Sequence, residues 1–101
     1  MKKYKKKSLN LSKLKKILSE SYAELKEIDS ELDIKFSYDL ILIGNKSIDS
    51  VSLLNFLLII EKKLNKKFKI NASILELDLF SSNKKTDIND LINIIIVKYD
   101  L

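Results

Sequence analysis

The chain has 101 residues, 46% of them hydrophobic, and 19 Lys or Arg against 14 Asp or Glu give a net charge of +5. This length fits one domain, and the apolar fraction suffices for one modest core. His and Cys are absent, which excludes a thiol nucleophile, a His-based triad and a Cys or His metal site. The basic start leads into no apolar run, and the longest such run, residues 56–60, is too short to cross a bilayer. We therefore expect a cytoplasmic protein without a metal.

The first predicted element is an amphipathic helix from about Asn10 to Leu32. Its apolar residues recur in steps of three and four, which places them on one face. Five of residues 1–7 are Lys, which predicts a basic, flexible tail, and the helical domain is expected over residues 8–101. The apolar stripe consists of Leu11, Leu14, Leu18, Tyr22, Leu25, Ile28 and Leu32.

Residues 33–49 have a different pattern, in which apolar and other residues alternate before a turn at Gly44 and Asn45. Alternation is typical of a strand. A lone strand has nothing to pair with in a helical chain, so we interpret the segment as a long extended connection that packs back on the helices. A short strand is the alternative.

The second main helix is predicted from Ser50 to about Lys66, with Asp49 as its N-cap. It is apolar nearly all round, so it is either the central helix of a bundle or partly exposed for a partner. A short helix is predicted near 73–81 and a loop over 81–85. Thr86 or Asp87 is expected to cap a last helix, whose apolar face comprises Ile88, Leu91, Ile92, Ile95 and Tyr99.

The order of these elements, with an Asp-Ser pair opening the second helix, resembles that of acyl and peptidyl carrier proteins. Their signature is an Asp-Ser-Leu-like triplet, here Asp49-Ser50-Val51, and the match is best from Ile48 to Ile70. Residues 36–40 (Phe-Ser-Tyr-Asp-Leu) resemble the Phe-x-x-Asp-Leu element of the family, although about seven extra residues separate it from Asp49. The acidic and apolar positions that follow the family's serine are filled here by Glu61, Leu64 and Phe68.

The resemblance implies an all-α, acyl-carrier-like bundle of three main helices plus one short helix, with a long connection between helices one and two. It also implies a covalent 4′-phosphopantetheine arm on Ser50, which would carry an acyl or aminoacyl group as a thioester. The arm's thiol would do the chemistry, so the chain itself is not expected to be an enzyme. Asp49 would assist recognition of the site, and Val51, Leu54 and Phe56 would contact partner enzymes.

The partners implied are a phosphopantetheinyl transferase, an acyl or aminoacyl ligase and a downstream transferase of lipid or secondary metabolite biosynthesis, acting on a monomer. The charge of the second helix departs from the family, because most acyl carriers are acidic there and this helix is Lys-rich. Two alternatives remain. One is an unmodified protein-interaction module, and the other is a Lys-driven binder of nucleic acid or a membrane surface. Without Arg, base-specific reading of nucleic acid is not expected.

Overall fold

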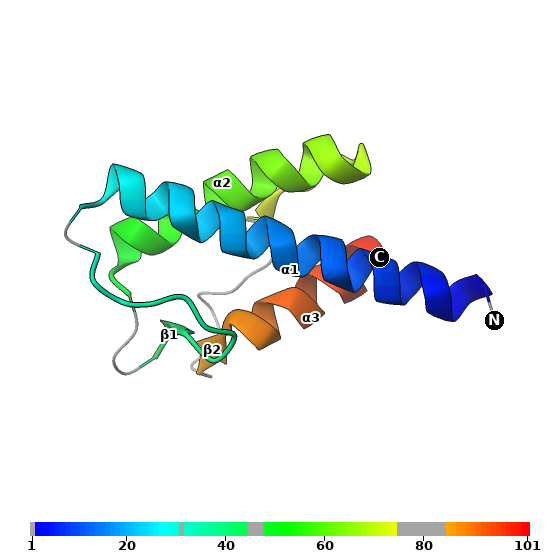
Figure 1. The fold of residues 1–101 in the computed structure, drawn as a ribbon, viewed down its shortest axis with the longest axis horizontal. Helices are drawn as coiled ribbons and strands as arrows, with labels where there is room; N and C mark the ends of the chain where they lie inside the picture. Colours follow the sequence, from blue (N-terminus) through cyan, green and yellow to red (C-terminus); the bar gives the residue numbers. More distant parts are fainter. Residues whose placement is uncertain (1, 31, 45–47, 75–84) are drawn as a thin grey trace.

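The computed structural model describes residues 2–30, 32–44, 48–74 and 85–101, with side chains from Asn10 onward. These residues form three helices and two short strands, in the order α1 (Lys2–Ile28), β1 (Ile41–Ile43), α2 (Ser50–Phe68), β2 (Thr86–Asp87) and α3 (Ile88–Tyr99). Helix α1 runs along the molecule, with α2 on one side of it and α3 on the other in Figure 1. The helical character predicted for the chain is confirmed. No helix among the described residues is long and apolar enough to span a bilayer.

Helix α1 buries one face, as its periodicity predicted. Leu14, Leu18, Tyr22 and Leu25 are almost completely buried. The predicted ends of the helix were wrong: α1 begins at Lys2 instead of Asn10 and ends at Ile28 instead of Leu32. Ile28 is 68% exposed, so no burial holds the helix together there. Asp and Ser follow at positions 29 and 30, and such side chains favour turns over helix interiors.

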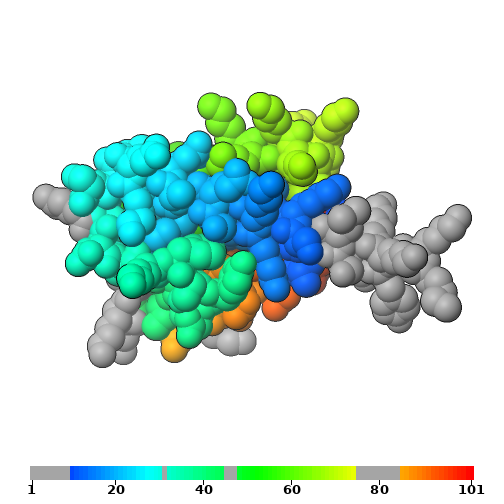
Figure 2. All heavy atoms as spheres, in the orientation of Figure 1, coloured from blue at the N-terminus to red at the C-terminus, as the bar shows by residue number. Residues whose placement is uncertain are grey.

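The connection from α1 to β1 packs back on the helices, as expected. The Phe36 ring lies 5.5 Å from that of Tyr22, centroid to centroid, and the Tyr22 hydroxyl donates a hydrogen bond to the Ile34 carbonyl oxygen. The Lys15 Nζ lies 5.3 Å from the centre of the Tyr38 ring. In Figure 2 the side chains of this connection fill the near face beside α1.

The interpretation of residues 41–43 as part of a strandless connection was wrong. They form β1, which pairs antiparallel with β2, with Ile41 opposite Asp87 and Ile43 opposite Thr86. The sequence pattern gave residues 86 and 87 only a capping role, so the partner strand was missed. Gly44 directly follows β1 and has a φ of 126°, a backbone angle that residues with a side chain rarely adopt.

Helix α3 begins directly after β2. The Asp87 carboxylate accepts a hydrogen bond from the Asp90 amide, and the Asp90 carboxylate accepts one from the Asp87 amide, which makes a capping box. Two further amides at the helix start donate to the connection: Ile88 to the Leu40 oxygen and Asn89 to the Tyr38 oxygen. The predicted cap and apolar face of this helix are confirmed. Its buried residues are Ile88, Leu91, Ile92 and Ile95.

Helix α2 is the helix that the pattern predicted best. It starts at Ser50 behind the Asp49 cap and ends two residues later than expected, at Phe68, where Lys69 takes the left-handed conformation. The short helix predicted near 73–81 falls mostly on residues 75–84, outside the described residues, as does most of the loop predicted at 81–85. Segment 70–74 is described and follows α2 without continuing it.

The core depends on Phe56 but not on Val51. Phe56 is fully buried and packs edge-on against Tyr22, with 5.7 Å between ring centroids, whereas Val51 is 68% exposed. We predict that Phe56→Ala lowers the free energy of unfolding by about 3–5 kcal/mol, because it removes contacts and leaves a cavity. The control Val51→Ala should change it by no more than about 0.5 kcal/mol. Urea unfolding followed by circular dichroism measures both; equal effects would contradict the packing described here.

Burial also raises the pKa of the Tyr22 phenol above its ordinary value of 10.0. The folded state therefore holds this proton more tightly than the unfolded state. We predict that the Tyr22 contribution to stability is fully present below pH 10.0 and is lost as the pH rises through the higher pKa of the folded state. Spectrophotometric titration should show one tyrosine that ionises late. Tyr22→Phe should remove that component, and its survival in the variant would refute the assignment.

Candidate functional site

Ser50 is the first residue of α2 and its side chain is exposed. Asp49 precedes it in an extended conformation, and the first backbone hydrogen bond of the helix runs from the Leu53 amide to the Asp49 oxygen at 2.9 Å. Amides in the first turn have no acceptors within a helix. A group attached to the Ser50 Oγ would therefore project into solvent beside free N–H groups and the positive end of the helix dipole.

Asp49 holds the start of α2 in place. Its Oδ1 accepts a hydrogen bond of 2.8 Å from the Ser52 amide, and its Oδ2 lies 3.3 Å from the Ser52 Oγ. The capping role predicted for Asp49 is confirmed. Since the carboxylate is turned toward Ser52, it orients the first turn and leaves the Ser50 hydroxyl uncovered.

A second carboxylate, that of Asp29, meets the same hydroxyl from the end of α1. The Ser52 Oγ donates to the Asp29 Oδ2 at 2.7 Å, and Ser52 is only 2% exposed. One buried hydroxyl thus joins the end of α1 to the start of α2. Sequence reasoning missed both residues. The spacing from Asp49 to Ser52 is that of an N-cap and its N3 residue, so the sequence does indicate the contact between these two residues. Nothing in the sequence near Asp29 indicates that it contacts Ser52.

The residues expected to contact partners do not share one environment. Val51 and Leu54 are exposed, at 68% and 41%, next to Ser50 on the outside of α2. Phe56 is fully buried, so its expected place on the contact surface is wrong. The pattern could not separate these residues, because α2 is apolar nearly all round and its buried side depends on where α1 and α3 lie.

The three positions that follow the serine in the carrier pattern have structural roles. The Glu61 Oε1 accepts a 2.8 Å hydrogen bond from the Ile74 amide, which holds the segment after α2 against the helix. Leu64 is fully buried, and Phe68 is partly buried against the core. The acidic residue at position 61 thus has a structural role, because it links α2 to the backbone of the next segment.

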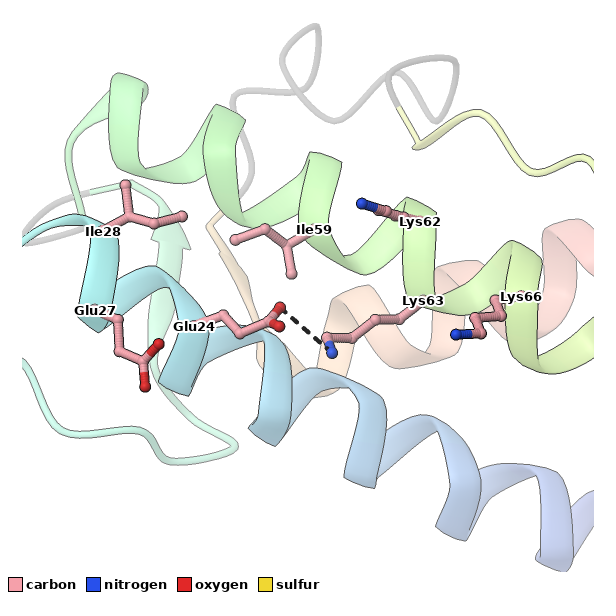
Figure 3. Close-up of a pocket in the computed structure, with 7 residues that line it drawn as sticks. All are labelled: Glu24, Glu27, Ile28, Ile59, Lys62, Lys63 and Lys66. Atoms are coloured by element: carbon pink, nitrogen blue, oxygen red, sulfur yellow. Dashed lines mark ion pairs between the residues drawn. The ribbon is translucent and has the colours of Figure 1, made fainter.

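A shallow groove of about 410 Å³ runs between α1 and α2. Figure 3 shows its acidic wall on α1 and its basic wall on α2, with Ile59 between them. Lys63 crosses the groove to Glu24, with 3.3 Å between Nζ and Oε2. This surface pair is worth at most about 1 kcal/mol. The groove is lined by Glu24, Glu27, Ile28, Ile59, Lys62, Lys63 and Lys66.

No protein-family model matches the chain, and no curated protein or solved structure is similar enough to it to count as a match. The resemblance to carrier proteins therefore stays a prediction from the spaced residues between Ile48 and Ile70.

The cap can be tested by substitution. We predict that Asp49→Ala destabilises the protein by about 0.5–2 kcal/mol, because the Ser52 amide at the start of α2 loses its acceptor. Asp49→Asn keeps an acceptor oxygen and should cost much less. Chemical unfolding measures both variants. A loss in Asp49→Asn as large as in Asp49→Ala would show that the charge, and not the cap, matters.

Proposed function

We propose that the chain is a carrier protein that holds an acyl or aminoacyl group as a thioester on a 4′-phosphopantetheine arm attached to Ser50. The observation that carries the proposal is the exposed Ser50 side chain at the first residue of α2, behind an ordered Asp49 cap. A serine in this place is reachable by a modifying enzyme. The helix start also stabilises the negative charge of the phosphodiester that would form there.

The attachment step is a phosphoryl transfer from coenzyme A. The Ser50 Oγ forms a bond to the phosphorus that bears the pantetheine, the phosphoanhydride bond breaks, and 3′,5′-ADP leaves. The hydroxyl proton goes to a base of the phosphopantetheinyl transferase, since the chain has no His to accept it. The arm on Ser50 would supply a thiol, which the chain lacks because it has no Cys, to hold the acyl or aminoacyl group that an ATP-dependent ligase provides. A downstream transferase would receive the group.

The chain contributes position to this cycle, not catalysis. Asp49 and Asp29 fix the first turn of α2 through Ser52, so Ser50 is presented in one orientation. The exposed side chains of Val51 and Leu54 lie beside it and offer an apolar contact to enzymes that work on the arm. Exposed apolar residues also favour a second function, an unmodified protein-interaction module that uses the same face of α2.

Mass spectrometry distinguishes these functions. We predict that co-expression with a broad-specificity phosphopantetheinyl transferase increases the mass of the intact chain by one phosphopantetheine group. Ser50→Ala should abolish this gain in mass, because it removes the hydroxyl to which the arm would be attached.

The matched control is Ser19→Ala, which removes an exposed serine from the middle of α1 and should leave the modification intact. Circular dichroism verifies that both variants fold. An unchanged mass of the folded parent chain with several transferases would reject the carrier function and favour the unmodified module.

A further inference from the structure

One exposed stripe runs the length of α2. It starts beside Ser50 with three apolar residues, Val51, Leu54 and Leu58, which are 68%, 41% and 43% exposed. Lys62 and Lys66 continue it, and both are exposed. The steps of three and four residues place all five side chains on one helical face. The stripe is therefore apolar near Ser50 and basic toward the end of the helix.

Among the described residues no ion pair engages the two lysines of this stripe, although Glu24 and Glu27 line the opposite wall of the groove that they border. Glu61, the acid of α2, binds the Ile74 amide, and Glu24 of α1 pairs with Lys63 at the inner edge. Within the described ranges, the structure gives Lys63 an ion pair but gives none to Lys62 or Lys66. In Figure 3 the Lys63 side chain extends toward Glu24, whereas the Lys62 and Lys66 ammonium groups lie away from both acidic residues.

We propose that this stripe docks a protein partner whose contact surface combines an apolar recess with carboxylates at its rim. The proposal rests on the carrier function, because the partner is then the enzyme that loads or unloads the arm at Ser50. Apolar residues at the centre of such a contact supply affinity, and the charges at its rim steer association and select partners. The Lys62 and Lys66 ammonium groups would meet the carboxylates while Val51, Leu54 and Leu58 enter the recess.

The chemistry of the stripe favours a protein over a membrane or nucleic acid. Phosphate groups are attracted to Lys but gain nothing from the three apolar side chains that occupy the half nearest Ser50. A helix that lies in a membrane needs a broad apolar face with Lys along its flanks. Here the apolar residues form a narrow row, and the lysines follow them along the helix axis. An apolar row that ends in two lysines, to which the described part of the chain gives no ion pair, is complementary to a recess bordered by acids.

Two synthetic helical peptides provide the test. Both carry the same Leu-rich face; one has Glu beside that face and the other has Lys at the same positions. They are titrated into the isotope-labelled, unmodified chain, and amide chemical shifts are followed by NMR. We predict that the Glu peptide shifts signals of residues 51–66 along the stripe, that this binding weakens as salt rises, and that the Lys peptide binds far more weakly.

Charge reversal gives the second arm. Lys62→Glu combined with Lys66→Glu should weaken binding of the Glu peptide at least about tenfold and strengthen binding of the Lys peptide. Lys62→Gln with Lys66→Gln should shift both affinities in the same directions by less, without placing acids at the end of the helix. The matched control is Lys26→Glu with Lys98→Glu, which changes net charge equally at exposed positions of α1 and α3 and should leave the preference unchanged.

Several results would overturn the proposal. Equal binding of the two peptides would make the contact purely apolar, and an absence of shifts on α2 would remove the docking surface. Tighter binding to phosphatidylserine vesicles or duplex DNA than to the Glu peptide would assign the lysines to those partners. Concentration-dependent shifts on α2 without peptide would assign the face to a second copy of the chain. Because the titration uses the unmodified chain, its outcome is independent of whether Ser50 accepts the arm.

Discussion

The burial of the Tyr22 side chain is the constraint on which the arrangement of the first two helices depends. Tyr22 is 1% exposed, and its ring meets Phe56 of α2 on one side and Phe36 of the connection on the other. Its hydroxyl donates to the Ile34 carbonyl oxygen, so a polar group that would be costly to bury alone has a partner. One side chain of α1 thus fixes both α2 and the long connection that precedes it. The orientation of the helix that carries Ser50 follows from that contact.

Sequence patterns predicted those parts of the fold whose determinants are local. The Asp49 cap and the start of α2 at Ser50 were correct because a cap is decided within four residues. The end of α1 was wrong because Leu32 continued the periodicity, although it packs on the core from outside the helix. Strand β1 was assigned to a connection because its partner, β2, lies more than forty residues further along the chain. A short apolar run does not indicate which distant segment of the chain it will pair with.

The same distinction applies to the site. Ser50, Asp49, Val51 and Leu54 lie at the start of α2 as the pattern indicated. Asp29 could not be predicted, because its contact with Ser52 joins two helices across the connection. Phe56 was placed on the wrong side of α2. The sequence of a helix that is apolar on all sides does not indicate which side is buried, because this depends on the positions of the neighbouring helices. What gives this α2 its individual character is charge: its one acid accepts a hydrogen bond from the Ile74 amide, and Lys62 and Lys66 are exposed.

The segment that follows α2 is held by side chains instead of by secondary structure. The Asn65 amide group binds both the amide and the carbonyl oxygen of Ala72, Glu61 binds the Ile74 amide, and the Tyr99 hydroxyl binds the backbone of Ser73. Ala72 and Ile74 are also buried in the core, so residues 72–74 form a unit that is anchored by packing as well as by these hydrogen bonds. The stability of that unit is encoded in two other elements, α2 and α3. Natural sequence variation at a helix position such as 65 or 99 would consequently change the local stability of a stretch in which no residue had been altered.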